Sequence, residues 1–385
     1  MTDLSAIAPK YERFPKGYIN DVRGWAFDSE TIHNQAGKLL TLDLDFGSRC
    51  SLNCPFCFRR DNSVDKHQRA MRTEDVLTLV DEAMELGLRT VKFLGAGEPL
   101  ENPGFLHLLR ELSDRGIISV VFTKTGILGN DRQVNQLYGG QGIGSSQKLC
   151  EVLESLGVSI VLGFNSLDPE IQSLMVGNGR QYVERRDRSL LNLLDTGFAD
   201  SNPTRLALGI NPITNLNIRG AAGLYKWARV RNIYAIVTPT MISGRAKGDA
   251  WRLMTPKVNE LEQLYVDIYN FNFQTGLQSK NQVLKEGISA YAGGHPCNQV
   301  STGLYVTLNG VVLRCPGSED TVQGNIWTRS IEDVWLTSKN YQMRGTFNCA
   351  CVAKDGKSIP RGFYDEVLSD LASERSLIMN SRESI

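Results

Sequence analysis

The chain has 385 residues, of which 41% are hydrophobic, and its 42 basic and 42 acidic side chains cancel to a formal net charge of zero. This balance is ordinary for a globular protein and gives no general electrostatic reason to bind a nucleic-acid backbone or an anionic membrane. The N-terminus lacks the basic and apolar segments of an export signal, and no uncharged apolar run could span a bilayer, so we expect a cytoplasmic protein.

Three regions follow one another along the chain. After an N-terminal extension, residues 1–39, residues 40–249 alternate apolar runs with amphipathic segments. Strands are expected at 38–46, 90–97, 119–126, 159–166, 205–213 and 233–244, and helices at 72–87, 104–116, 147–157, 189–197 and 220–231. Such repetition predicts an α/β fold with a parallel sheet, either a partial (β/α)6 barrel or an open doubly wound sheet.

Two details of this region depend on side-chain patterning. The helix at 72–87 is expected to bury Val76, Leu77, Val80 and Met84 on one apolar face. The polar, glycine-rich stretch 126–146 is interpreted as a surface loop, with a lid above the site as the alternative.

Residues 250–385 are interpreted as a second, smaller domain. A helix is expected at 255–271 with Thr255 as its N-cap. Residues 303–317 have the pattern of two short strands joined at Asn309 and Gly310, a pair typical of hairpin turns.

Eight cysteines form two groups and one single residue. They are too sparse for a disulfide scaffold and favour metal binding or redox chemistry in a reducing compartment. Cys150 lies on the apolar side of an expected helix, so we expect it in the core.

The first group, Cys50, Cys54 and Cys57, has the spacing C-x3-C-x2-C directly after the first expected strand. Three thiolates can hold three irons of a [4Fe-4S] cluster and leave the fourth iron free to bind a small molecule. A zinc site is the alternative, although zinc would normally need a fourth Cys or His nearby.

This pattern, with Phe56 before its last cysteine, resembles the cluster motif of the radical S-adenosylmethionine (SAM) superfamily. Segments that resemble the family's SAM-binding motifs follow in the same order. "GAGEPL" resembles its Gly-Gly-Glu-Pro motif, with Ala96 where glycine is commoner, and the resemblance implies that Glu98 pairs with the SAM amino group. The residues that the resemblance assigns to SAM binding are Phe56, Ala96, Gly97, Glu98, Pro99, Thr123, Thr125, Ser166 and Asp168.

The resemblance covers roughly residues 40–245 and implies a partial (β/α)6 TIM-like barrel with its functional groups at the carboxyl ends of the strands. It also implies reductive cleavage of SAM into methionine and a 5′-deoxyadenosyl radical, which abstracts a substrate hydrogen atom. The electron is expected from a reductant such as flavodoxin or ferredoxin. The sequence identifies no catalytic acid or base.

The second group begins with Cys297 and Cys315, whose spacing C-x12-G-x4-C includes Gly310. This spacing resembles the start of the auxiliary-cluster domain of the SPASM and twitch subfamily, and Cys349 and Cys351 complete four thiolates. A short, twitch-like C-terminal domain with one auxiliary [4Fe-4S] cluster is therefore expected, which makes two clusters in all. Zinc would also suit four thiolates, and unrelated buried cysteines are a further alternative. If geometry excludes Cys349 or Cys351, the auxiliary cluster would keep an open iron.

The resemblance leaves the reaction open between dehydrogenation and a redox-neutral change such as epimerisation. Because the first 38 residues are too short for a peptide-recognition domain, we expect a small-molecule substrate such as a sugar or aminocyclitol. Modification of a peptide or protein side chain is the alternative, and a non-catalytic zinc or iron-sulfur protein is the rival of another class. Neither a nucleic acid nor a membrane is an expected partner.

Overall fold

The computed structural model describes residues 4–59, 69–248, 254–319 and 321–373. In these residues the core is one sheet of nine strands in the order β6-β5-β4-β3-β2-β1-β7-β8-β9. The first six strands pair in parallel with their neighbours in the chain, which confirms the predicted partial barrel. They are β1 (Thr41–Leu44), β2 (Thr90–Phe93), β3 (Ile118–Thr123), β4 (Ser159–Gly163), β5 (Leu206–Ile213) and β6 (Tyr234–Pro239).

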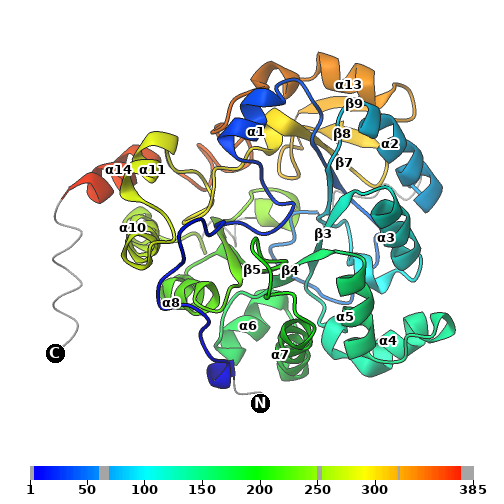
Figure 1. Ribbon diagram of the computed structural model, residues 1–385, viewed down its shortest axis with the longest axis horizontal. Coiled ribbons are helices and arrows are strands. Elements are labelled where there is room, and N and C mark those ends of the chain that lie inside the picture. The colour runs from blue at the N-terminus through cyan, green and yellow to red at the C-terminus, as the bar shows by residue number, and fades with distance from the viewer. Residues whose placement is uncertain (1–3, 60–68, 249–253, 320, 374–385) are drawn as a thin grey trace.

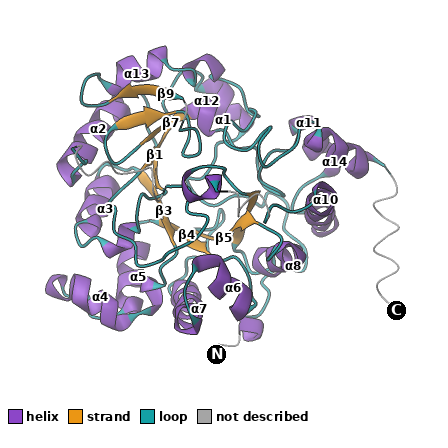
Figure 2. Ribbon diagram, turned by 180° about the vertical axis from the view of Figure 1, so that it is seen from behind, coloured by secondary structure: helices purple, strands orange, loops and turns teal. Residues whose placement is uncertain are grey.

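Helices surround the curved sheet on its outer side (Figure 2). Every crossover between these strands carries at least one helix, and the apolar faces of helices and sheet form one continuous core. The crossover helices are α2 (Thr73–Glu85), α3 (Phe105–Asp114), α4 (Asp131–Tyr138), α5 (Ser146–Ser155), α6 (Pro169–Val176), α7 (Arg180–Asp195) and α8 (Ile218–Arg229). Cys150 is fully buried in this core, as predicted.

The C-terminal hairpin extends the same sheet. Strand β7 (Gly303–Val306) pairs in parallel with β1, and β8 (Val311–Leu313) and β9 (Val322–Asn325) continue in antiparallel fashion. The turn between β7 and β8 contains Gly310 with φ of +78°, which confirms the predicted hairpin. Because β8 runs antiparallel to β7, the segment after β8 continues toward the amino end of β1.

Further helices complete the C-terminal part. Helices α10 (Val258–Thr275), α11 (Lys280–Glu286) and α14 (Phe363–Ala372) lie together at one side of the molecule (Figure 1). Helices α12 (Gln299–Thr302) and α13 (Ile331–Thr337) flank the hairpin. The N-cap of α10 is Lys257, so the prediction of Thr255 was wrong by two residues.

The N-terminal extension, which includes α1 (Ser29–Asn34), closes the amino end of the barrel. Val22 packs among inward-facing side chains of β3 to β6, and Trp25 lies against the same cluster. A side chain at Gly24 would come within 2.6 Å of Ile118 Cγ2, so the chain passes very close to the sheet there. The extension therefore covers the amino ends of the barrel strands.

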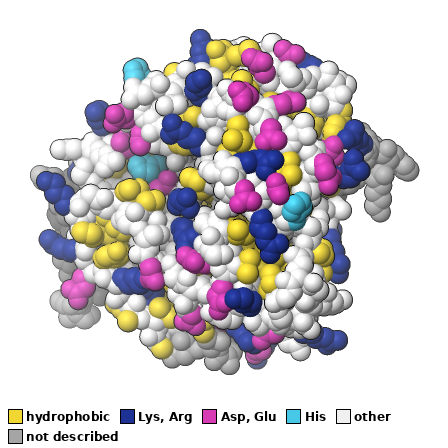
Figure 3. Space-filling model, turned by 45° about the vertical axis from the view of Figure 1, so that its right-hand side comes forward, with side chains coloured by type: hydrophobic (Ala, Val, Ile, Leu, Met, Phe, Trp, Pro, Cys, Tyr) yellow, Lys and Arg dark blue, Asp and Glu magenta, His cyan; other side chains and the backbone are white. Residues whose placement is uncertain are grey.

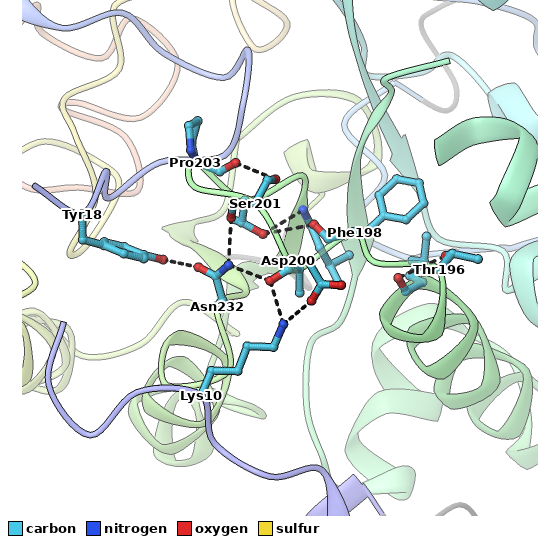
Figure 4. A network of polar contacts seen from close by, with 12 residues as sticks. Lys10, Tyr18, Thr196, Phe198, Asp200, Ser201, Pro203 and Asn232 are labelled. Carbon is cyan, nitrogen blue, oxygen red and sulfur yellow. Dashed lines mark hydrogen bonds and ion pairs between the residues drawn. The ribbon is translucent and has the colours of Figure 1, made fainter. Parts of the chain in front are cut away.

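Polar contacts hold the extension in place (Figure 4). Tyr18 donates a hydrogen bond to Asn232 Oδ1 over 2.6 Å, and the Asn232 amide donates to the carbonyl oxygens of Ala199 and Ser201. Lys10 donates to the Ala199 carbonyl and forms an ion pair with Asp200. The extension is thus part of the folded barrel.

The structure corrects the interpretation of residues 126–146. This stretch contains α4 between the short 3-10 helices η3 (Ile127–Gly129) and η4 (Gly139–Gln141), and it is neither a loop nor a lid. Ile127, Leu128, Val134 and Tyr138 are fully buried, and the Tyr138 hydroxyl donates to the Leu100 carbonyl over 2.7 Å. Glycine and polar residues make up most of the stretch, so its composition concealed the helix.

The buried face of α2 also differs from the prediction. It consists of Val76, Leu79, Val80 and Ala83, whereas Leu77 is half-buried and Met84 is 36% exposed. The observed buried residues follow the i, i+3, i+4, i+7 spacing of one helical face, starting from Val76. The four predicted residues do not all fit this spacing.

The surface gives little further indication of a partner. Acidic and basic side chains are interspersed over the face in Figure 3. Among the described residues no helix is both long enough and apolar enough to cross a membrane.

Candidate functional site

A cavity of about 270 Å³ lies at the carboxyl ends of the barrel strands. Both cysteine groups line it, although they are far apart in the sequence. The seven cysteines in its wall are Cys50, Cys54, Cys57, Cys297, Cys315, Cys349 and Cys351. The structure therefore brings together all the cysteines that the sequence selected and leaves Cys150 in the core.

The first cysteine loop rests on the segment that follows β2. The Glu98 amide donates to the Arg49 carbonyl over 2.7 Å. A Cβ at Gly97 would lie 2.3 Å from that same carbonyl oxygen, so this position requires glycine. Glu101 is buried and accepts hydrogen bonds from both the amide and the hydroxyl of Ser51. These contacts determine where the loop presents its thiols.

Apolar side chains surround the first group. Cys50 and Cys54 pack against a small cluster that includes Leu52, Val176 and Tyr182. Burial, followed by the charge of Glu98, raises the pKa of Cys50 to about 12. Such a shell limits access of water and influences the redox properties of any metal group that the thiolates hold.

Among the residues assigned to SAM binding, Glu98 has the position best suited to contact a ligand in the cavity. Its side chain is 4% exposed and lines the cavity. One carboxylate oxygen accepts hydrogen bonds from the amides of Lys124 at 2.9 Å and Thr125 at 3.3 Å. Burial raises the pKa of Glu98 to about 7, against the effect of these amides. The carboxylate is thus rigidly held and still faces the cavity, where a cationic ligand group would stabilise its charge.

The other assigned residues divide into two sets. Phe56, Gly97 and Thr123 line the cavity together with Glu98, whereas Ala96, Pro99, Thr125, Ser166 and Asp168 do not line it. The Ser166 hydroxyl accepts a hydrogen bond from the Asp168 amide, and Asp168 caps α6 by accepting from the amides of Glu170 and Ile171. The hydrogen bonds of Ser166 and Asp168 in the structure are therefore those of a turn and a helix cap.

Three chain segments bring the second group together. The segment before Cys297 runs along β6, where Ala292 pairs with Val237. Cys315 lies two residues after β8, and Cys349 and Cys351 lie on the loop before α14. The Cys351 amide donates to Asp355 over 2.7 Å, which anchors this loop.

The four thiols of this group differ in environment. Burial, followed by the charge of Cys351, raises the pKa of Cys297 to about 11 and also raises the pKa of Cys315. Cys349 instead donates a hydrogen bond to the Thr346 carbonyl over 3.7 Å. Cys315 and Cys349 nevertheless pack in one small buried cluster, with Cys351 against its edge.

The donor set fits iron-sulfur chemistry. Soft thiolates are the ligands of such clusters, and each group offers at least three in a cavity wall. Among the described residues, no three Cys, His, Asp or Glu side chains are already at the spacing for one metal ion. A four-iron cluster is larger than an ion and holds its thiolates further apart than the short bonds to a single zinc ion do.

Two buried polar networks near the cavity were not predicted from the sequence. On its floor, Lys92 forms an ion pair with Asp43 at 3.3 Å and donates to Gln299 at 3.0 Å. Burial raises the pKa of Asp43 to about 6, and the charge of Lys92 opposes this. The alternation of Asp43 and Lys92 with apolar residues in their strands was the only signal available.

The second network joins the two cysteine-bearing regions. Arg59, two residues after Cys57, forms a buried ion pair with Asp45 at 2.9 Å. Asp45 also accepts a hydrogen bond from the hydroxyl of Tyr305 on β7 and one from the Leu308 amide. The loop of the first group is thus tied to the hairpin that carries Cys315.

Comparison with known families identifies one match. Residues 44–219 match the model of the radical SAM superfamily. Among curated relatives, the chain is 34% identical over 79 residues to a probable GTP 3′,8-cyclase of Sulfurisphaera tokodaii and 28% identical over 93 residues to a GTP 3′,8-cyclase of Clostridium perfringens. These alignments cover 20% and 24% of this chain, and only 24% and 28% of the relatives' length.

Solved structures resemble the fold over a much larger part of the chain. The structure of anSMEcpe with bound AdoMet has a TM-score of 0.60 and 14% identity, with 90% of this chain and 100% of that chain covered. SuiB of Streptococcus suis, bound to its precursor peptide SuiA, has a TM-score of 0.55 and 17% identity over 82% of this chain and 68% of that one. At such identities the likeness concerns the fold alone.

Proposed function

We propose, from the match of residues 44–219 to the radical SAM superfamily model, that this protein cleaves SAM reductively and removes a hydrogen atom from a substrate held in the cavity between its two cysteine groups. Cys50, Cys54 and Cys57 would hold a [4Fe-4S] cluster with one open iron. Cys297, Cys315, Cys349 and Cys351 would supply the ligands of an auxiliary cluster.

One observation carries this proposal. The seven cysteines outside the core line a single cavity, and Glu98 shares its wall with the first group. A structural metal site would need neither a cavity nor a buried carboxylate facing it. The shared wall therefore favours an enzyme over a protein that uses two metal sites only for folding.

The chain's own residues have distinct tasks in this proposal. When bound, the cluster and SAM supply a reductively generated carbon radical that abstracts hydrogen. Glu98 binds the SAM ammonium through its free lone pairs, while the amides of Lys124 and Thr125 hold its carboxylate in place. Leu52 and Tyr182 keep water from the thiolates of the first group.

For the substrate we propose a small polar molecule that undergoes dehydrogenation or epimerisation. The cavity volume of about 270 Å³ and the polar groups on its floor, Asp43, Lys92 and Gln299, support this class. An auxiliary cluster next to the cavity would take up the electron that a dehydrogenation releases.

A peptide side chain is the second candidate substrate. The fold likeness to SuiB, whose structure contains a precursor peptide, and to anSMEcpe covers 82% and 90% of this chain and supports this candidate. In this case a side chain would enter the cavity from a peptide bound outside it.

The decisive test is anaerobic reconstitution with iron and sulfide, followed by SAM and dithionite, with quantification of 5′-deoxyadenosine. We expect two clusters per chain and 5′-deoxyadenosine formation that disappears in Cys54→Ala. Cys150→Ala is the matched control, because Cys150 lies in the core away from the cavity.

Zinc without sulfide, or 5′-deoxyadenosine formation that is unaffected in Cys54→Ala, would contradict the proposal. Deuterium transfer into 5′-deoxyadenosine from labelled sugars, aminocyclitols and peptides would then separate the two substrate classes.

A further inference from the structure

Each cysteine group has one lysine whose ammonium lies on an aromatic ring. Lys124 lies over the ring of Phe56, with Nζ 4.7 Å from the centroid. Lys354 lies over the ring of Tyr291, with Nζ 4.8 Å from the centroid. All four residues line the cavity that contains both cysteine groups. The SAM-binding assignment does not account for either lysine.

The first lysine is directed to its position by the barrel. Lys124 follows β3, and its aliphatic stem crosses the end of β4. A Cβ at Gly163 would lie 2.6 Å from Lys124 Cγ, so glycine at this position makes room for the stem. The ring on which its ammonium lies belongs to Phe56, which directly precedes Cys57, so Lys124 stands beside the first cysteine group.

The second lysine is directed to its position by the loop that carries Cys351. Lys354 is 2% exposed, and its amide donates to the Cys351 carbonyl over 3.1 Å. Asp355 holds the loop by accepting from the Cys351 amide and from the Tyr364 hydroxyl, each at 2.7 Å. Lys354 also lines the same cavity as Cys297 and Cys315, so it stands beside the second group.

Neither ammonium has an acidic partner in the described part of the chain. Each makes only the contact with its ring, whereas Lys92 in the same cavity is paired with Asp43. A buried cation without a counter-ion is costly unless a negative group is bound nearby. The thiolate-ligated clusters of the proposed function are net anionic and would be those groups.

We propose that Lys124 and Lys354 are positioning cations that raise the reduction potentials of the first and the auxiliary cluster, respectively. This inference rests on the proposed function. Uptake of one electron from an external reductant makes a cluster more negative by one charge, so a fixed cation beside it stabilises the reduced form more than the oxidised form. Two separate lysines thus allow the two potentials to be set independently.

Potentiometric titration with dithionite, read by electron paramagnetic resonance, tests this directly and needs no substrate. Each lysine is tested in a background that holds only the cluster beside it. Lys124→Met is combined with Cys315→Ala and Cys351→Ala, which remove the auxiliary cluster. Lys354→Met is combined with Cys50→Ala, Cys54→Ala and Cys57→Ala, which remove the first cluster. We expect the ratio of reduced to oxidised cluster at a fixed potential to fall about tenfold, a shift of 59 mV for one electron. Lys→Arg at the same positions should restore most of the ratio because it keeps the charge.

Lys148→Met is the control, because Lys148 is an exposed lysine on α5 paired with Glu151. If each Met variant has the same reduction potential as its own single-cluster background, with iron and sulfide content unchanged, the inference is overturned and the proposed function stays intact. Absence of either cluster from the parent protein would overturn both. The iron and sulfide content of each variant therefore distinguishes the two failures.

Discussion

The two cysteine groups reach the same cavity by opposite routes. The first occupies one loop after β1, and its three cysteines fall within residues 50–57. The second draws its cysteines from three segments between residues 297 and 351, which meet because β7 pairs with β1 and the hairpin continues the barrel sheet. The sequence spacing alone brings the cysteines of the first group together, whereas those of the second group meet only because of the topology of the sheet.

The two groups nevertheless share a method of anchoring. In each, a carboxylate accepts a hydrogen bond from a backbone amide at or beside a cysteine: Glu101 from Ser51 and Asp355 from Cys351. In each, a lysine on an aromatic ring stands beside the thiols. Similar local requirements have thus been met on unrelated backbone segments.

The largest expected difference between the groups concerns turnover. Cys54→Ala should reduce 5′-deoxyadenosine formation to background, because three thiolates are the minimum for a cluster with one open iron. Cys351→Ala should retain SAM cleavage but lose the auxiliary cluster. Single-turnover assays with dithionite measure both. Equal loss of 5′-deoxyadenosine in the two variants would remove the functional distinction between the groups.

The next effect concerns the link between the groups. Asp45→Ala leaves Arg59 buried without its partner and removes the acceptor for Tyr305, so we expect the free energy of unfolding to fall by about 3–5 kcal/mol. Urea unfolding of the metal-free protein measures it. Lys148→Ala, which breaks the exposed ion pair with Glu151, is the control. A loss below about 1 kcal/mol would mean that the two regions are not coupled through Asp45.

A smaller effect is expected for SAM binding at the first group alone. Glu98→Gln should weaken SAM binding about 10-fold to 100-fold, because it replaces a charge-assisted hydrogen bond with a neutral one. Equilibrium binding of SAM to the reconstituted protein measures this, with Glu151→Gln on the surface of α5 as the control. Unchanged affinity would show that the ammonium is bound elsewhere.

Backbone packing at the first group gives a further prediction. Gly97→Ala forces a methyl group against the Arg49 carbonyl, and we expect a loss of stability of about 1–3 kcal/mol and less iron in the first group only. Ala96→Gly is the matched control, since it adds no atoms to the neighbouring position. Iron and sulfide analysis with thermal unfolding provides the measurement. Reduced iron in the auxiliary group would contradict the separation of the two sites.

The smallest effect should distinguish members of the second group. Cys349→Ser should lose less of the auxiliary iron than Cys351→Ser, because the charge of Cys351 acts on Cys297 and Cys315 whereas the Cys349 thiol also bonds to the Thr346 carbonyl. Iron content per chain measures both. Equal losses in the two variants would establish four equivalent ligands.

Much of the fold could be predicted because parallel strands and crossover helices have strong local patterns. The six barrel strands and the turn at Gly310 followed from apolar runs and from one glycine whose backbone conformation few other residues adopt. Helix α4 was missed because only a few apolar residues in a polar stretch report its burial. The buried face of α2 was misplaced because its apolar residues are close together in the sequence, and more than one helical face can be drawn through them.

The sequence by itself determined the first cysteine group, since three thiols on one short loop lie together in any conformation of that loop. It also determined the order of the segments around Glu98. Tertiary structure alone decided that the second group faces the same cavity, that Asp45 connects Arg59 to Tyr305, and that one lysine lies beside each group. The physical reason is that these contacts join residues on different strands and loops, whose proximity depends on strand pairing and burial across the whole sheet.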